Sequence, residues 1–134
     1  MLSSSKTLII DYYQSSYGPS IMIKTNSIDH LIELKEIMSK LKHKIIPEYC
    51  LSNMANAHIM GMKDLIMKIK TKVQPNKKIT EFKDGNQILQ WLININDLEY
   101  YEGLIDGLIE SNKPGHQYLT NEGDNVLIEL SYME

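Results

Sequence analysis

The sequence predicts an α+β fold with a mostly antiparallel sheet built from hairpins and with two main helices. Short segments of alternating apolar and polar residues are separated by turn-forming sequences, which is typical of hairpins. Two longer segments, about 27–43 and 96–112, carry apolar residues every three or four positions, the period of an amphipathic helix. Strands come in runs and do not alternate with helices, so the pattern favours α+β over α/β.

The first expected elements are a hairpin and a helix. Residues 6–14 alternate in hydropathy, and a Gly- and Ser-rich turn leads from them into the strand-like segment 20–25. The helix over 27–43 follows, and we expect Asn26 to be its N-cap, with Asp29 in the first turn.

The rest of the chain adds strands around the second helix. The tail of 58–72 alternates like a strand, and Gly61 argues against one continuous helix there. Asp84–Gly85 is a type I′ turn signal, so residues 79–83 should pair antiparallel with 86–91 and bury Trp91. A last hairpin is expected over about 116–133. Since no linker or repeat interrupts the chain, residues 1–134 should form a single domain.

Composition indicates an ordinary globular protein. Of the 134 residues 43% are hydrophobic and 23% are charged. No signal-peptide core or membrane-span pattern is present in the sequence, and one cysteine, Cys50, allows no internal disulfide. We therefore expect a cytoplasmic protein without membrane association, in which Cys50 is a buried structural thiol.

Charge is distributed very unevenly along the chain. Residues 1–80 hold twelve Lys and six acidic residues, a balance of +6, whereas residues 81–134 hold two Lys and eleven acidic residues, a balance of −9. All 14 basic residues are Lys, so the bidentate clamping of phosphate that Arg provides is absent. Such an uneven charge distribution indicates what kind of partner the protein attracts and says little about its fold.

Sequence motifs of catalysis are missing. The four histidines lack metalloprotease or zinc-finger spacing, and the glycines form no phosphate-binding loop. We therefore expect no enzyme, no metal and no cofactor, and we expect His30 to face solvent. An alternative remains: a small enzyme or ligand-binding domain using the region around His116, Glu102 and Asp106, with the loop residue His116 as general base.

A basic row of lysines raises the question of nucleic-acid binding. Lys68, Lys70 and Lys72 share one face of a predicted strand. No aromatic platform is interleaved with them, so no direct nucleic-acid binding is expected. Lysines on an exposed edge strand also guard against aggregation, which is the plainer interpretation.

An acidic row on the second helix is the main electrostatic clue. Residues Glu99, Glu102, Asp106 and Glu110 fall on one stripe, where like charges repel by about 0.2–0.5 kcal/mol per pair. The stripe lies away from the apolar face of the helix, so it should be near solvent, and reversing its charges should spare folding. A solvated helix face is one interpretation.

The other interpretation is a docking face for a basic protein, made of acidic and tyrosine side chains. Tyr132 and Glu129 of the last hairpin could contribute to it. The residues that we expect to bind a partner are Glu99, Tyr100, Glu102, Asp106, Glu110, His116, Tyr118, Glu122 and Asp124.

The C-terminal part of the chain also carries a resemblance. "LIDGLIESNKPGHQYLTNEGDNVLIELSYME", in which "GHQYL" is followed by a hairpin ending "LIELSY", resembles small bacterial immunity proteins of contact-dependent growth inhibition and related polymorphic toxin systems. The resemblance implies a cytoplasmic non-enzyme that binds and neutralises the C-terminal toxin domain of a sister protein. Such toxins are often nucleases, whose phosphate-gripping surface is cationic and would suit an acidic inhibitor.

Overall fold

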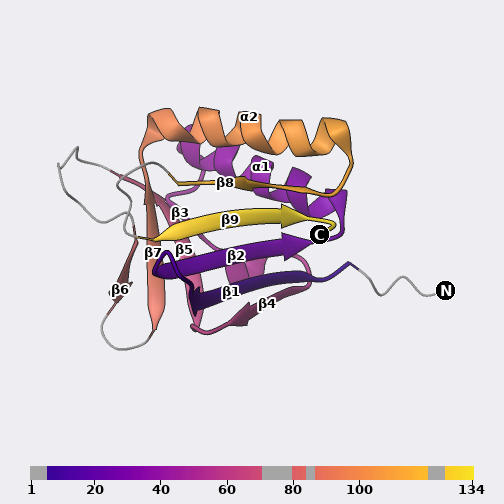
Figure 1. Ribbon diagram of the computed structural model, residues 1–134. Helices are drawn as coiled ribbons and strands as arrows, with labels where there is room; N and C mark the ends of the chain where they lie inside the picture. The colour runs from indigo at the N-terminus through magenta and orange to yellow at the C-terminus, as the bar shows by residue number, and fades with distance from the viewer. Residues whose placement is uncertain (1–5, 71–79, 84–86, 121–125) are drawn as a thin grey trace.

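The computed structural model describes residues 6–70, 80–83, 87–120 and 126–134, the segment 80–83 by its backbone alone. The described residues form an α+β fold, as the sequence predicts (Figure 1). Its elements are β1 (Leu8–Gln14), β2 (Pro19–Thr25), α1 (Ile28–Lys42), β3 (Glu48–Cys50), the 3-10 turn η1 (Leu51–Asn53), β4 (Ala57–Met60), β5 (Asp64–Ile69), β6 (Thr80–Lys83), β7 (Ile88–Ile93), α2 (Ile95–Ser111), β8 (Gly115–Tyr118) and β9 (Leu127–Tyr132).

The strands form two mixed sheets. A five-stranded sheet has the order β4-β1-β2-β9-β8, and a four-stranded sheet has the order β3-β5-β7-β6. The three predicted hairpin pairs β1–β2, β6–β7 and β8–β9 are antiparallel, as is β3–β5. Parallel pairs β1–β4, β2–β9 and β5–β7 join these units, and the sequence analysis did not foresee them. The turn at Asp84–Gly85 lies outside the described residues.

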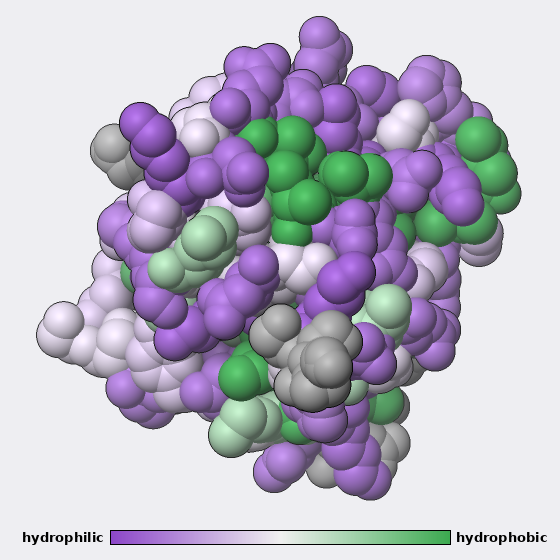
Figure 2. Space-filling view, turned by 90° about the vertical axis from the view of Figure 1, so that its right-hand side faces the viewer, coloured by the Kyte–Doolittle hydropathy of each residue, from purple (hydrophilic) through white to green (hydrophobic). Residues whose placement is uncertain are grey.

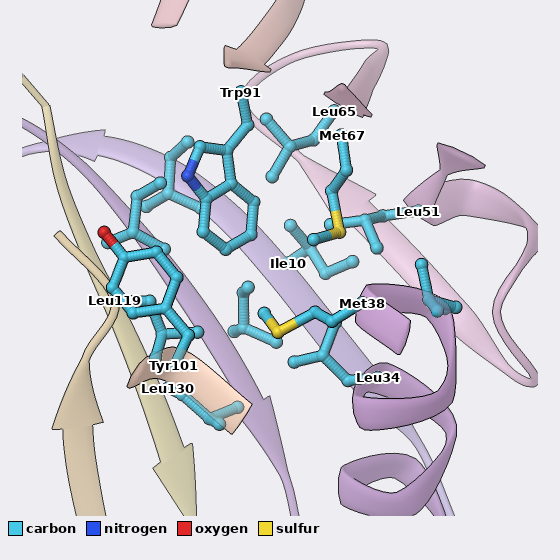
Figure 3. Packing of buried hydrophobic residues seen from close by; sticks show 14 of the residues in the cluster. Ile10, Leu34, Met38, Leu51, Leu65, Met67, Trp91, Tyr101, Leu119 and Leu130 are labelled. Atoms are coloured by element: carbon cyan, nitrogen blue, oxygen red, sulfur yellow. The ribbon is translucent and has the colours of Figure 1, made fainter. Parts of the chain in front are cut away.

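One core lies between the sheets and the helices. Alternate residues of the strands and the apolar stripes of α1 and α2 belong to one buried cluster. Figure 3 shows Trp91 of β7 pointing into it, between Leu65 and Met67 of β5 and Tyr101 of α2. The ring of Trp91 lies 6.4 Å from that of Tyr101, and Trp91 is 1% exposed, so its predicted burial is confirmed.

Both helices begin at polar caps. The side chain of Ser27 accepts a hydrogen bond from the backbone N–H of Asp29 at the start of α1. The prediction of Asn26 as the cap was wrong by one residue, because either side chain suits the position and only the backbone path decides between them. Asn94 caps α2 in the same way, through the N–H of Asn96.

The segment between β4 and β5 depends on a glycine. Gly61 has φ +77°, and a Cβ there would lie 2.1 Å from the carbonyl oxygen of Tyr12. Only a residue without a side chain fits both the backbone conformation and this close approach. The strand that follows, β5, carries Lys68 and is paired on both sides, so the expectation that Lys68 guards an exposed edge was wrong. Lys70 follows the strand, and Lys72 lies outside the described residues.

Across the described ranges, neither helix is long and apolar enough to cross a membrane.

Candidate protein-binding surface

The acidic row on α2 divides between two environments. Glu102 and Asp106 turn toward α1, where Glu102 Oε1 lies 2.7 Å from Lys42 Nζ and Asp106 Oδ1 lies 2.5 Å from Lys35 Nζ. The hydrogen bond to each carboxylate is the largest cause of a raised pKa in both Lys35 and Lys42. The side chain of Glu102 is 11% exposed, so the prediction that it lies near solvent was wrong, whereas that of Asp106 is 42% exposed.

The sequence could not reveal this arrangement, because the neutralising lysines stand about sixty and seventy residues earlier in the chain. Lys35 and Lys42 of α1 relieve the repulsion between the acidic side chains of the row. Glu102 and Asp106 therefore do not require a partner protein to neutralise them. Reversing these two charges would consequently disturb the contact between α1 and α2, contrary to the expectation that folding would be spared.

A groove of about 400 Å³ runs between the two helices. Its lining residues are Ile32, Lys35, Glu36, Ser39, Glu102, Asp106 and Ile109. His116 does not line it, so the groove lacks the general base that the alternative enzyme hypothesis combined with Glu102 and Asp106.

The remaining acids of the row face outward. Glu99 and Glu110 are exposed and make no ion pair with any residue that the structure describes. Gly103 and Gly107 stand on the same outward side, and a Cβ at either would meet no atom within 4 Å. Each mid-helix glycine costs about 0.8–1 kcal/mol relative to alanine. Close packing among the described residues does not require a glycine at either position. The two glycines do leave room for the surface of another protein to approach the helix.

Tyrosines near this helix differ in exposure. Tyr100 of α2 is 57% exposed and Tyr118 of β8 is 45% exposed, so both are available to a partner. Tyr132 is 2% exposed and donates a hydrogen bond to Asn112 Oδ1, which excludes it from the docking face that we expected. Glu122 and Asp124 lie outside the described residues.

His116 lies on a strand, not in the loop that the sequence suggested. Its Nδ1 is 2.9 Å from Glu134 Oε2, and its ring meets the ring of Tyr118 edge-on at 5.5 Å. The hydrogen bond to Glu134 raises the pKa of His116, and the same contact lowers the pKa of the Glu134 carboxyl. The contact therefore favours the protonated form of His116 and the ionised form of Glu134.

His30 is a buried structural residue, so the prediction that it faces solvent was wrong. It is 4% exposed, with Nδ1 2.6 Å from Thr25 Oγ1 and Nε2 2.7 Å from the carbonyl oxygen of Ala55. A carbonyl oxygen only accepts, so Nε2 carries the hydrogen, and in the neutral ring Nδ1 accepts from the hydroxyl of Thr25. The ring joins the end of β2, the start of α1 and the segment before β4.

Cys50 is partly buried at the end of β3. Burial is the main cause of a raised pKa of its thiol, and the nearby Asp64 and Glu48 act in the same direction. A raised pKa opposes the thiolate that a nucleophile needs. This agrees with the structural role expected for Cys50.

The outer face of the five-stranded sheet is a surface that the sequence analysis did not consider. Figure 1 shows β1, β2 and β9 from this face, with no helix across them. Tyr13 lies here, and its pKa is raised by burial and then by the charges of Glu129 and Asp11 and by Tyr118. The sequence signal for this face is the second set of alternating positions in each strand.

A different side of the molecule, at the end of α2 and the start of α1, is largely hydrophilic. Figure 2 shows hydrophobic side chains there as separate islands among polar ones. Such islands are common on monomeric proteins and do not mark an interface.

Comparison of the chain with protein-family models, with curated proteins and with solved structures found no match.

Proposed function

We propose that the protein is an immunity protein that binds a cognate toxin domain through an acidic surface and neutralises it without catalytic turnover. The observation that carries the proposal is the outward side of α2. It presents the exposed carboxylates Glu99 and Glu110, the exposed ring of Tyr100, and two glycines with open space beyond them.

Electrostatics supports a basic partner. Residues 81–134 carry a formal charge of −9, and within α2 there are acidic residues but no lysine. An acidic face attracts a cationic protein during diffusion and fixes its orientation, while aromatic side chains supply contact area. A nuclease that grips phosphate has such a cationic surface, which the acidic face would occupy in place of nucleic acid.

Side-chain exposure supports a narrower set of proposed contact residues. Glu99, Tyr100, Glu110 and Tyr118 are exposed and available. Glu102 and Asp106 form ion pairs that stabilise the position of α2 against α1. Their charges also contribute to the electrostatic potential around α2. His116 is engaged with Glu134 and is at most a peripheral contact.

The first experiment asks whether a partner exists. The neighbouring genes are searched for one that encodes a large protein with a C-terminal toxin domain, and that domain is co-expressed and co-purified with this protein. We expect a stoichiometric complex and survival of cells that the toxin domain alone kills. Killing that continues despite full expression of the protein would contradict the proposal.

The second experiment asks where the partner binds. The variant E99K/E110K is compared with the single variants and with E48K, which makes the same charge change as each single variant but on β3 of the four-stranded sheet. We expect each α2 variant to weaken binding about tenfold or more and E48K to leave it within twofold. The wild-type affinity should fall as salt rises, because exposed charges are screened. Equal binding by E99K/E110K and wild type would refute this interface.

A further inference from the structure

Three side chains of types that can ligate a metal ion, His116, Glu129 and Glu134, meet at the β8–β9 edge of the five-stranded sheet. The antiparallel register places His116 opposite Ser131 and Tyr118 opposite Glu129. Opposite residues of an antiparallel pair project to the same side, as do residues two apart along a strand. His116 and Glu129 therefore share the outer face of the sheet although thirteen positions separate them in sequence.

The end of the chain brings the third side chain to this face. Met133 has φ 60°, a left-handed conformation that turns the backbone, and its N–H donates to the carbonyl oxygen of Thr25 at 2.9 Å. After this turn, Glu134 lies over the sheet. Its Oε1 accepts from Ser131 Oγ at 2.8 Å and its Oε2 is 2.9 Å from His116 Nδ1. Glu134 is thus held by both strands.

We propose that His116, Glu129 and Glu134 bind a divalent transition-metal ion of the Zn²⁺ type. One ligand atom from each of the three lies within 4.8 Å of the others. Ligands at about 2.0–2.2 Å from a tetrahedral zinc ion lie roughly 3.3–3.6 Å apart, so the most distant pair of ligand atoms has to close by up to about 1 Å. With Nδ1 as the histidine ligand, the proton of the His116–Glu134 hydrogen bond leaves and this 2.9 Å pair opens by roughly half an ångström. Side-chain rotation of two glutamates that are not fully buried provides that movement.

The chemistry of the three ligands selects the class of ion. An imidazole nitrogen suits zinc, cobalt and nickel, whereas magnesium and calcium prefer oxygen ligands throughout. Two carboxylates also neutralise a divalent charge. Side-chain exposures of 42% for His116 and 36% for Glu134 leave room for water on the remaining positions of the ion.

Neighbouring groups orient these ligands. Ser131 donates to one oxygen of Glu134 and leaves the other directed at His116, and the ring of Tyr118 packs edge-on against the imidazole. Outer contacts of this kind fix ligand orientation in metal sites. The three proposed ligands include neither Glu99 nor Glu110, so zinc binding can be tested separately from the proposed toxin binding, although Tyr118 lies beside both surfaces.

The test is calorimetric titration of the full chain with ZnCl₂ after removal of metal with a chelator, and with MgCl₂ in a parallel run. We expect one Zn²⁺ per chain, no binding of Mg²⁺ at the same concentrations, and selective perturbation of the His116 imidazole signals in NMR spectra. H116A and E134Q should each weaken zinc binding at least tenfold. H58A is the matched control, because His58 is an exposed histidine on the same face of the sheet, at its opposite edge. It should bind within twofold of wild type.

Thermal unfolding of each variant without metal establishes that the replacements leave the fold intact. The proposal is overturned if zinc fails to bind at concentrations up to 1 mM. It is equally overturned if H116A binds zinc as tightly as wild type, or if H58A loses as much affinity as H116A.

Discussion

Replacing His30 by alanine should destabilise the protein through the loss of one buried polar network. The ring is 4% exposed and Thr25 is 2% exposed, so the hydroxyl proton of Thr25 would lose its acceptor in a site shielded from water, while the hydroxyl oxygen keeps the hydrogen bond from the N–H of Ser27. Leaving such a group unsatisfied costs about 1–3 kcal/mol. The carbonyl of Ala55 belongs to an exposed residue and regains water at little cost. Removing the ring also leaves a cavity, so we expect a loss of about 2–4 kcal/mol in the free energy of unfolding.

Urea unfolding followed by the fluorescence of Trp91 measures this loss, since Trp91 is the single tryptophan and lies in the core. The matched control is H58A, an exposed histidine on β4, which should change stability by less than about 0.5 kcal/mol. A double-mutant cycle with T25V should show strong non-additivity, because either replacement breaks the same hydrogen bond. If H30A is no less stable than H58A, the network contributes nothing and our account of the α1 start is wrong.

Three further outcomes follow from the described contacts. E102K should lower the urea midpoint of unfolding because it places an ammonium group beside Lys42, whereas E99K should leave the midpoint unchanged. Equal midpoints for the two variants would contradict a stabilising ion pair between Glu102 and Lys42. G61A should lose at least about 2 kcal/mol of stability, through a positive φ and a clash with a backbone oxygen, and a stability equal to wild type would refute the close approach. The pH at which iodoacetamide alkylates Cys50 half-maximally should lie above that of an ordinary thiol, because the raised pKa keeps the group protonated to higher pH; a lower value would indicate an activated cysteine.

Local pattern was a good guide wherever neighbouring residues decide the structure. Alternation and turn formers predicted the β1–β2 and β8–β9 hairpins, and a 3.6-residue period predicted both helices to within about two residues at each end. Trp91 was correctly placed in the core because its strand alternates. These features depend on side-chain spacing and backbone propensity, which are properties of a short segment.

Only the tertiary structure decided which hairpins lie beside one another. The parallel pairs β2–β9 and β1–β4 join segments far apart in sequence. The local pattern of a short segment carries no information about such contacts. For the same reason the sequence showed the acidic row on α2 without showing Lys35 and Lys42 opposite it. It likewise could not show that a buried Thr25 hydroxyl would fix the ring of His30.

For function, the sequence by itself determined the uneven charge and the residue types available to a site. The fold decided which charges remain exposed: Glu99 and Glu110 stay in solvent, whereas Glu102 is enclosed by a neighbouring helix. It also placed His116 with Glu134, residues that no spacing rule connects, because strand register and a left-handed residue at Met133 bring them together. Charge is carried by the amino acids themselves, but its exposure and pairing depend on contacts that exist only in the folded chain.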